Sequence, residues 1–255
     1  MPIDPYSITA VPIFMNFESS RLAHGTAFFY KRRDEIYLVT NWHNLSGRNP
    51  LTGQSIKDVV PDNISVYLHA RNRPGEWGTE TFPLYDNSTS RWLQHSLQGQ
   101  NVDVAILKIS VSESSIVYPV NEVASFDGMR VEVGMDIFVL GFPIRLFTGI
   151  FPVWKRATVS TETDINVDGL PKFLIDTATR EGMSGSPVVV RQRGSYIDAS
   201  GNMIMGMASA TKFLGVYSGR YGSDNLEGAQ LGIVWKKELI DQIIDEGVPG
   251  QYQIR

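Results

Sequence analysis

The chain has 255 residues, of which 42% are hydrophobic and 20% are charged, and its formal net charge is -4. This length and composition are typical of a globular protein with one large domain or two lobes that share a core. The slight negative charge provides no basic face for nucleic acid, so no nucleic-acid partner is expected. No apolar run approaches the length that spans a bilayer, so no membrane partner is expected either.

Cysteine is absent and the histidines number four. Without thiolates, and with histidines scattered along the chain, the sequence predicts neither a metal site nor a cofactor. The lack of disulfides fits a reducing compartment. The first ten residues contain no basic, apolar leader, so a cytoplasmic location is expected, with export by an unrecognised route left open.

Short β-rich segments separated by turns rich in glycine and proline fill the N-terminal half. Residues 25–30 and 36–40, joined by the polar turn 31–35, predict a hairpin. The stretches 47–62, 71–78 and 86–100 are expected to be loops, turns or irregular. The expected strands of this half are 11–17, 25–30, 36–40, 64–68 and 104–109.

The C-terminal half repeats this β-rich pattern after residues 110–127, a serine-rich stretch without periodicity that we take as the boundary between two lobes. Short strands at fairly even spacing favour a sandwich or a barrel. Leu239, Ile240 and Ile243 fall on one helical face, which predicts a helix that ends at Gly247. The expected strands of this half are 137–140, 156–161, 173–175, 188–190, 203–208, 214–217 and 231–234.

Three polar residues lie at the ends of expected strands, where a rigid scaffold presents catalytic groups. His43 follows one strand, Asp103 precedes another, and Ser184 lies between glycines in the turn Arg180–Pro187. Each residue alone has a plain structural explanation, as a turn histidine, a strand-edge charge or a loop serine. Together, the order His, Asp, Ser is that of one lineage of serine hydrolases, while other lineages use other orders.

Blocks around these residues resemble the trypsin-like serine proteases, especially the bacterial, disulfide-free branch that includes the high-temperature-requirement proteases. The similar blocks span residues 23 to 246. They are Gly25–Phe28, Leu38–His43, Asp103–Leu107, Val133–Gly134 through Leu140–Pro143, Ile175–Ala178 and Gly182–Pro187.

The resemblance implies an all-β fold of two antiparallel six-stranded β-barrels, packed face to face, with a C-terminal α-helix. The whole chain, residues 1–255, would form a single trypsin-like peptidase domain. The N-terminal barrel would cover about 11–115, the C-terminal barrel about 128–235 and the helix about 236–246.

The resemblance also implies a serine endopeptidase that forms an acyl-enzyme on Ser184. His43 would act as general base and acid, and Asp103 would orient and stabilise its ring. The turn Gly182, Met183 and Ser184 would form the oxyanion hole, with the amides of Gly182 and Ser184 as donors. The substrate would be a protein or peptide, with a protein activator as a further partner to consider.

Two positions depart from the family pattern. Met183 replaces the aspartate that pairs with a newly cut N-terminus in zymogen-activated relatives, so the site must form directly or be switched in another way. Ser186 replaces the second glycine of G-x-S-G-G. Because serine is small, we expect little effect from it.

Ala178, six residues before the serine, replaces the pocket-floor aspartate of trypsins, which disfavours cleavage after Arg or Lys. With Ser218 and Gly219 as further substrate-binding residues in the segment 214–220, we expect cleavage after a small or medium apolar residue. His24, His69 and His95 match no motif and are expected to be structural or on the surface.

Two alternatives stay open. The first is a catalytically silent or partner-gated binding or regulatory module on a protease-like fold. The second is an unrelated β-sandwich with a chance G-x-S-G.

Overall fold

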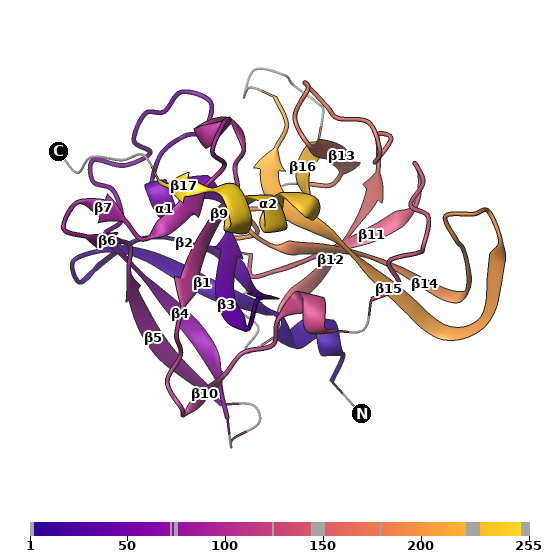
Figure 1. The fold of residues 1–255 in the computed structure, drawn as a ribbon, viewed down its shortest axis with the longest axis horizontal. Coiled ribbons are helices and arrows are strands. Elements are labelled where there is room, and N and C mark those ends of the chain that lie inside the picture. Colours follow the sequence, from indigo (N-terminus) through magenta and orange to yellow (C-terminus); the bar gives the residue numbers. More distant parts are fainter. Residues whose placement is uncertain are drawn as a thin grey trace.

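A computed structural model of the chain describes residues 3–71, 73, 76–123, 125–143, 151–178, 180–222 and 230–250. The described chain forms two β lobes side by side, with the N-terminal half in one and most of the C-terminal half in the other (Figure 1). Every named pair of neighbouring strands is antiparallel. The all-β class expected from the sequence is confirmed.

The N-terminal lobe is built on a nine-stranded sheet in the order β10-β4-β1-β2-β3-β9-β8-β17, with β5 paired to β4. This sheet differs from the expected six-stranded barrel, because short strands extend it, among them β17 near the C-terminal end of the described residues. The strands are β1 (Ala10–Phe17), β2 (Ser20–Arg32), β3 (Glu35–Thr40), β4 (Asn63–Ala70), β5 (Trp77–Pro83), β8 (Trp92–Gln94), β9 (Ala105–Ile109), β10 (Ser115–Ile116) and β17 (Val248–Pro249), with β6 (Tyr85–Asp86) and β7 (Thr89–Ser90) as a separate pair.

The C-terminal lobe is a closed six-stranded barrel in the order β11-β12-β13-β16-β15-β14. Its closure removes exposed strand edges, as expected for a barrel. The strands are β11 (Asp136–Gly141), β12 (Val153–Val159), β13 (Lys172–Asp176), β14 (Pro187–Ile197), β15 (Met203–Arg220) and β16 (Leu231–Lys236).

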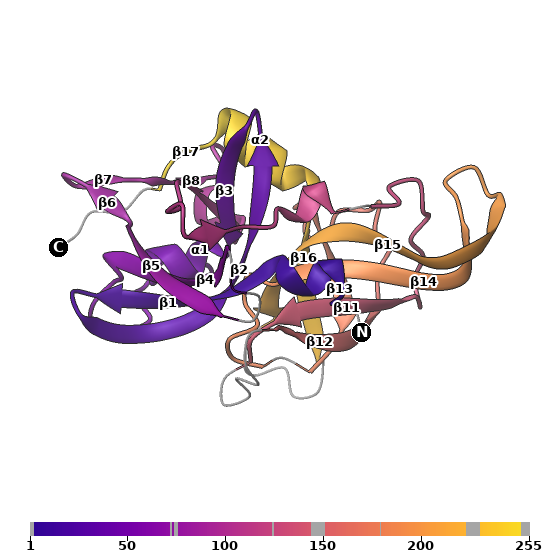
Figure 2. The same ribbon diagram turned by 90° about the horizontal axis from the view of Figure 1, so that it is seen from below.

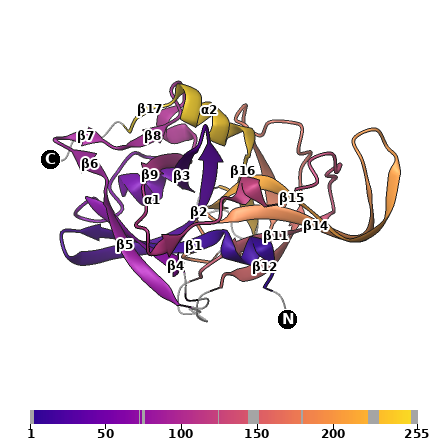
Figure 3. The same cartoon turned by 60° about the horizontal axis from the view of Figure 1, so that its bottom comes forward.

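One barrel strand corrects the sequence interpretation. Residues 203–208 and 214–217, expected as separate strands, belong to the single strand β15, because β14 also continues past the barrel and pairs with it to Met203. Register shifts near Gly194 let this long hairpin bend. Figures 2 and 3 show its tip projecting away from both lobes.

The helices are short. The expected C-terminal helix is confirmed as α2 (Glu238–Glu246), with Leu239, Ile240 and Ile243 buried. A helix that the sequence did not reveal, α1 (Trp42–Ser46), follows β3 and contains His43; five residues are too few for a helical period to show. The described residues also form three 3₁₀ turns: η1 (Pro5–Ile8), η2 (Gly99–Asn101) and η3 (Val120–Glu122).

Three groups of buried apolar side chains stabilise the molecule. One fills the N-terminal lobe and one fills the C-terminal barrel. The third lies between the lobes and under α2, where Phe28 of β2 meets Phe213 of β15 edge to face at 5.5 Å. Burial of apolar surface drives folding and is insensitive to direction, so this third group holds the two lobes together as one body.

Residues near both ends of the described chain make polar contacts with the lobes. Asp4 pairs with Arg191 of β14 at 3.0 Å, and the guanidinium of Arg191 lies over the Trp154 ring. At the other end, α2 returns to the N-terminal lobe, where Tyr30 donates a hydrogen bond to Asp241 at 3.1 Å. These contacts attach the segment before β1 to the C-terminal barrel, and α2 to the N-terminal lobe.

Candidate active site

His43 and Asp103 are joined at two points. The ring Nδ1 donates to Asp103 Oδ2 at 2.7 Å, and the backbone N–H of His43 donates to Oδ1 at 2.9 Å. The helix α1 makes this possible, because its first turn directs both the amide and the ring of His43 toward Asp103, which lies two residues before β9. Since a carboxylate only accepts, Nδ1 carries the proton and Nε2 keeps a free lone pair.

Asp103 is itself held by residues from both lobes. It is buried, and its backbone carbonyl accepts from Asn41 Nδ2 at 2.7 Å. The hydroxyl of Ser218, on β15 of the other lobe, donates to Asp103 Oδ2. The carboxylate is thus buried and fully hydrogen-bonded, the state in which a buried charge is tolerated.

The pKa of His43 results from two opposed effects. Burial alone lowers the pKa, because it disfavours the imidazolium. The charge of Asp103 and its hydrogen bond raise it by more, so the net pKa of His43 lies above 6.5. The ring is thereby made a better proton acceptor than a free imidazole.

Ser184 lies in a turn whose shape depends on the glycines on either side. Gly182 and Gly185 both have φ of +89°, a region that residues with a Cβ rarely adopt. A Cβ at Gly182 would lie 2.2 Å from His24 Nε2, and one at Gly185 would lie 2.1 Å from the Thr26 carbonyl. The turn therefore requires glycine at both positions.

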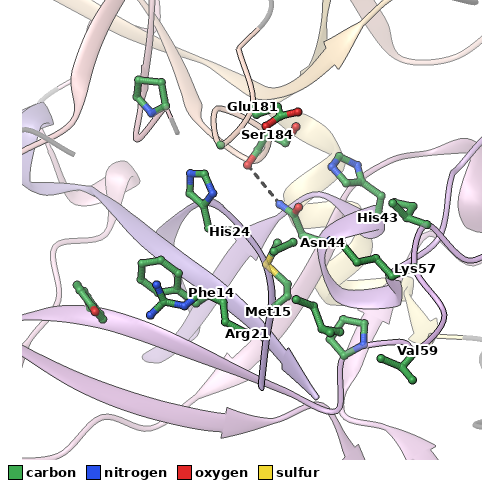
Figure 4. Close-up of a pocket in the computed structure, with 18 residues that line it drawn as sticks. Phe14, Met15, Arg21, His24, His43, Asn44, Lys57, Val59, Glu181 and Ser184 are labelled. Atoms are coloured by element: carbon green, nitrogen blue, oxygen red, sulfur yellow. Dashed lines mark hydrogen bonds between the residues drawn. The ribbon is translucent and has the colours of Figure 1, made fainter. Parts of the chain in front are cut away.

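The N-terminal lobe holds this turn through its backbone. Ser184 O accepts from the Thr26 amide at 2.9 Å and from Asn44 Nδ2 at 3.2 Å, the second of which is drawn in Figure 4. The Thr26 hydroxyl donates to Gly182 O at 2.7 Å and accepts from the Phe142 amide at 3.0 Å. These contacts couple the position of the serine to the packing of the two lobes.

Two of the four backbone N–H groups of Gly182–Gly185 donate hydrogen bonds within the described chain. Met183 N–H donates to Arg180 O at 3.2 Å, and Gly185 N–H to Tyr217 O at 2.9 Å. Within the described chain, the amides of Gly182 and Ser184 have no acceptor. They are the two donors that the sequence assigned to an oxyanion hole.

The Met183 side chain attaches the serine turn to the C-terminal barrel. It is 1% exposed and packs in the apolar core of the C-terminal barrel. Burial of this apolar side chain stabilises the position of the turn. The Ser186 hydroxyl next to it is fully buried and has no hydrogen-bond partner among the described residues.

His43 and Ser184 face the same open cavity of about 790 Å³, shown in Figure 4. In the described chain no hydrogen bond joins the His43 ring to the Ser184 hydroxyl. Such bonds are often long in free enzymes and shorten when substrate binds, so this geometry is compatible with catalysis.

The predicted substrate-binding residues lie outside this cavity. Ala178, half-buried, follows β13, and Ser218 and Gly219 lie near the end of β15. None of them lines the cavity. Ser218 contacts Asp103, a role that the sequence analysis missed because 115 positions separate the two residues.

Two cations lie close to Ala178. Lys155 Nζ donates to the hydroxyl of Thr177, and burial together with the nearby Arg180 lowers the pKa of Lys155. The carboxylate of Asp176 acts in the opposite direction on this pKa, so an acid also lies beside these two cations.

Three further residues at the site were missed or differently interpreted. Thr26 and Asn44 hold the serine turn, as described above. His24, expected to be structural or on the surface, lines the cavity, where its Nε2 donates to Phe142 O at 3.1 Å. The alternation of side chains along β2 could indicate which way His24 and Thr26 point, but not which residues they contact.

Among the described residues there is no group of three or more side chains suited to hold a metal ion, and no helix is long and apolar enough to cross a membrane.

Comparisons with known proteins assign the chain to a family. The model of the trypsin-like peptidase domain family matches residues 25–197, more than half of the chain. The chain therefore belongs to this family, and the resemblance inferred from its motifs is confirmed. It is a trypsin-like serine protease by family and by fold.

Solved structures of proteases share the fold. The serine endoprotease from Yersinia pestis superposes with a TM-score of 0.53 and 15% identity, over 96% of this chain and 67% of that one. The protease Anisep from Arthrobacter nicotinovorans gives 0.50 and 15%, over 90% of each chain. The MamO protease domain from Magnetospirillum magneticum gives 0.50 and 15%, over 93% and 96%. No curated protein matches the chain.

Proposed function

We propose that this protein is an endopeptidase whose catalytic residues are Ser184, His43 and Asp103. The observation that carries the proposal is the His43 Nδ1 to Asp103 Oδ2 hydrogen bond of 2.7 Å, beside a cavity that also contains Ser184. That bond leaves Nε2 free to accept a proton on the side of the cavity.

In the first half-reaction, Ser184 Oγ attacks the peptide carbonyl and His43 Nε2 takes the hydroxyl proton. The carbonyl oxygen becomes an oxyanion, which the amides of Gly182 and Ser184 stabilise; one such donor contributes about 10²–10³ in kcat. His43 then gives its proton to the leaving amine, and an ester on Ser184 remains. In the second half-reaction, water attacks this ester with His43 again as base.

For specificity we propose a small or medium apolar residue before the scissile bond, bound near Ala178, Ser218 and Gly219. Ala178 itself offers no counter-charge to a basic side chain, and the nearby Lys155, Arg180 and Asp176 together carry a net positive charge. A peptide-library profile dominated by Arg or Lys would contradict this proposal.

A fluorophosphonate probe tests the proposal, because it reacts only with an activated serine. We expect covalent labelling of the wild-type protein and none of the Ser184→Ala variant. Ser186→Ala is the matched control, since it removes a nearby hydroxyl that is fully buried, and it should still be labelled. Labelling of Ser184→Ala at the wild-type rate would refute Ser184 as nucleophile.

The second candidate is a catalytically silent or partner-gated module. The observation in its favour is the lack of a hydrogen bond between His43 and Ser184 in the described chain. A folded wild-type protein that the probe does not label, alone or with peptide substrates, would favour this candidate. Labelling that begins only when a protein activator is added would identify the gated form.

A further inference from the structure

The cavity that starts at Ser184 extends into the N-terminal lobe. Glu181 and Ser184 lie on one side of it in Figure 4, with Phe14 and Arg21 on another and Lys57 near His43. Its walls come from the β1–β2 hairpin, from the loop after α1 and from the serine turn. A cavity of about 790 Å³ has room for several side chains of a peptide.

The residues that line this cavity indicate which half of the substrate it would bind. The candidate acyl pocket consists of residues of the C-terminal barrel, Ala178, Ser218 and Gly219, and none of them contributes to the cavity. His43, which protonates the leaving amine, does contribute. The half of the substrate that follows the scissile bond therefore has to pass through this cavity, if the proposed mechanism holds.

The inner part of the cavity is apolar. Phe14 and Met15 of β1 are buried there, and Phe14 packs against Tyr67 at 5.0 Å between ring centroids. Met15 pairs with Ala23 and Asn16 with Arg21, so Leu22 is an extra residue in β2. Such a bulge redirects side chains, and Arg21, Leu22 and Ala23 all line the cavity as a result.

The outer wall is apolar too, although it faces solvent. Ile56 is 57% exposed and Val59 is 37% exposed, both in the loop after α1. Exposed apolar side chains opposite a buried apolar floor form a groove that an apolar ligand side chain would cover.

Two cations stand at the edge of this groove. Arg21 lies 3.7 Å above the Phe14 ring, and Lys57 is on the opposite wall. Neither makes an ion pair with any residue in the described part of the chain. Glu181, beside Ser184, is the one acidic side chain among the described residues that line the cavity, so its outer edge is left with positive charge.

From these features we infer that the cavity binds the leaving half of the substrate and selects apolar side chains at the first two positions after the scissile bond, followed by acidic residues. The apolar side chains would enter between Met15, Leu22 and Ile56. The acidic residues would meet Arg21 and Lys57. This inference rests on the proposed peptidase activity and adds the substrate class to it.

The test compares four peptides with the same acyl half and the leaving halves Leu-Leu-Glu-Glu, Leu-Leu-Lys-Lys, Ser-Ser-Glu-Glu and Ser-Ser-Lys-Lys. We expect kcat/KM to be about tenfold or more higher with Leu-Leu than with Ser-Ser, because an apolar pocket discriminates by roughly that much per missing group. Glu-Glu should exceed Lys-Lys by about twofold to fivefold, as expected for exposed charge pairs.

Substitutions of residues that line the cavity test whether the cavity causes these two substrate preferences. Ile56→Ser should reduce the preference for Leu-Leu, and the double variant Arg21→Glu, Lys57→Glu should invert the charge preference. Ile165→Ser and Arg91→Glu alter exposed residues outside the cavity by the same chemistry and should change neither preference. Preferences that stay the same in the cavity variants would overturn the inference.

A binding measurement keeps this inference separate from the activity. The four leaving halves, as free peptides, are titrated into the Ser184→Ala variant by calorimetry, with Leu-Leu-Glu-Glu expected to bind most tightly. If Ser184 is not labelled by the fluorophosphonate but this order of affinity is found, the proposed function fails and the cavity assignment stands. If the enzyme cleaves all four peptides within twofold and binds them equally, the function stands and the inference is overturned.

Discussion

The Asp103 carboxylate binds His43 through both oxygens, Oδ2 to the ring Nδ1 at 2.7 Å and Oδ1 to the backbone amide at 2.9 Å. One contact sets the tautomer of the ring and the other fixes the first turn of α1. Orientation of the base therefore does not depend on a single rotatable bond. The acid at position 103 is expected to matter more for this orientation than for proton transfer itself.

Asp103→Asn should lower kcat by about 10⁴, the loss measured when the same substitution is made in a Ser-His-Asp triad, because an amide stabilises the wrong tautomer. Steady-state hydrolysis of a peptide measures it. Asp34→Asn is the control, since Asp34 is almost fully exposed and has a positive φ that asparagine tolerates. Equal activity of the two variants would rule out the proposed role of Asp103.

Ser218→Ala removes the hydroxyl that donates to Asp103 Oδ2. A hydrogen bond to a charged group contributes about 1.5–3 kcal/mol, so we expect kcat to fall by roughly tenfold or more with little change in KM. Kinetics on a good peptide substrate separate the two parameters. A rise in KM at constant kcat would instead support the substrate-binding role expected from the sequence.

The pH profile should reflect the raised pKa of His43. Only the neutral ring accepts the serine proton, so kcat/KM should rise with pH and reach half its maximum above pH 6.5. NMR titration of the His43 ring checks the assignment. In Asp103→Asn, burial without the carboxylate should bring the pKa below 6.5. A midpoint that is the same in both proteins would contradict this account.

Gly185→Ala should destabilise the protein more than Gly201→Ala. Both glycines have positive φ, +89° and +85°, so both variants carry a left-handed strain of about 1–2 kcal/mol. A Cβ at Gly185 would also lie 2.1 Å from Thr26 O, whereas at Gly201 nothing lies within 4 Å. We expect this contact to cost about 1–3 kcal/mol more in the free energy of unfolding. Urea denaturation measures it, and equal midpoints would contradict the packing described for the turn.

Features that depend on neighbouring residues were predictable. The hairpin of β2 and β3 follows from β-rich runs around a charged turn, and α2 follows from apolar residues at helical spacing. Features that depend on distant partners were not. The strand β17 pairs with β8 across more than half the chain, and Val248 and Pro249 carry no strand pattern of their own.

The residues of the candidate site also fall into those that local sequence patterns identified and those that they did not. His43, Asp103 and Ser184 were identified because each stands at the end of a recognisable strand or in a glycine turn. Thr26 and Asn44 were not identified, because a threonine in a strand and an asparagine after a histidine are ordinary residues until Ser184 O is found between them.

By itself, then, the amino-acid sequence determined the β class, the C-terminal helix and the order of the three polar residues, since alternation, helical spacing and turn residues act over a few positions. Only the tertiary structure decided that Ser218 donates a hydrogen bond to Asp103, that Met183 is buried in a barrel core, and that a cavity leads from Ser184 into the N-terminal lobe. These depend on apolar packing between two lobes, which brings together residues that no local pattern connects.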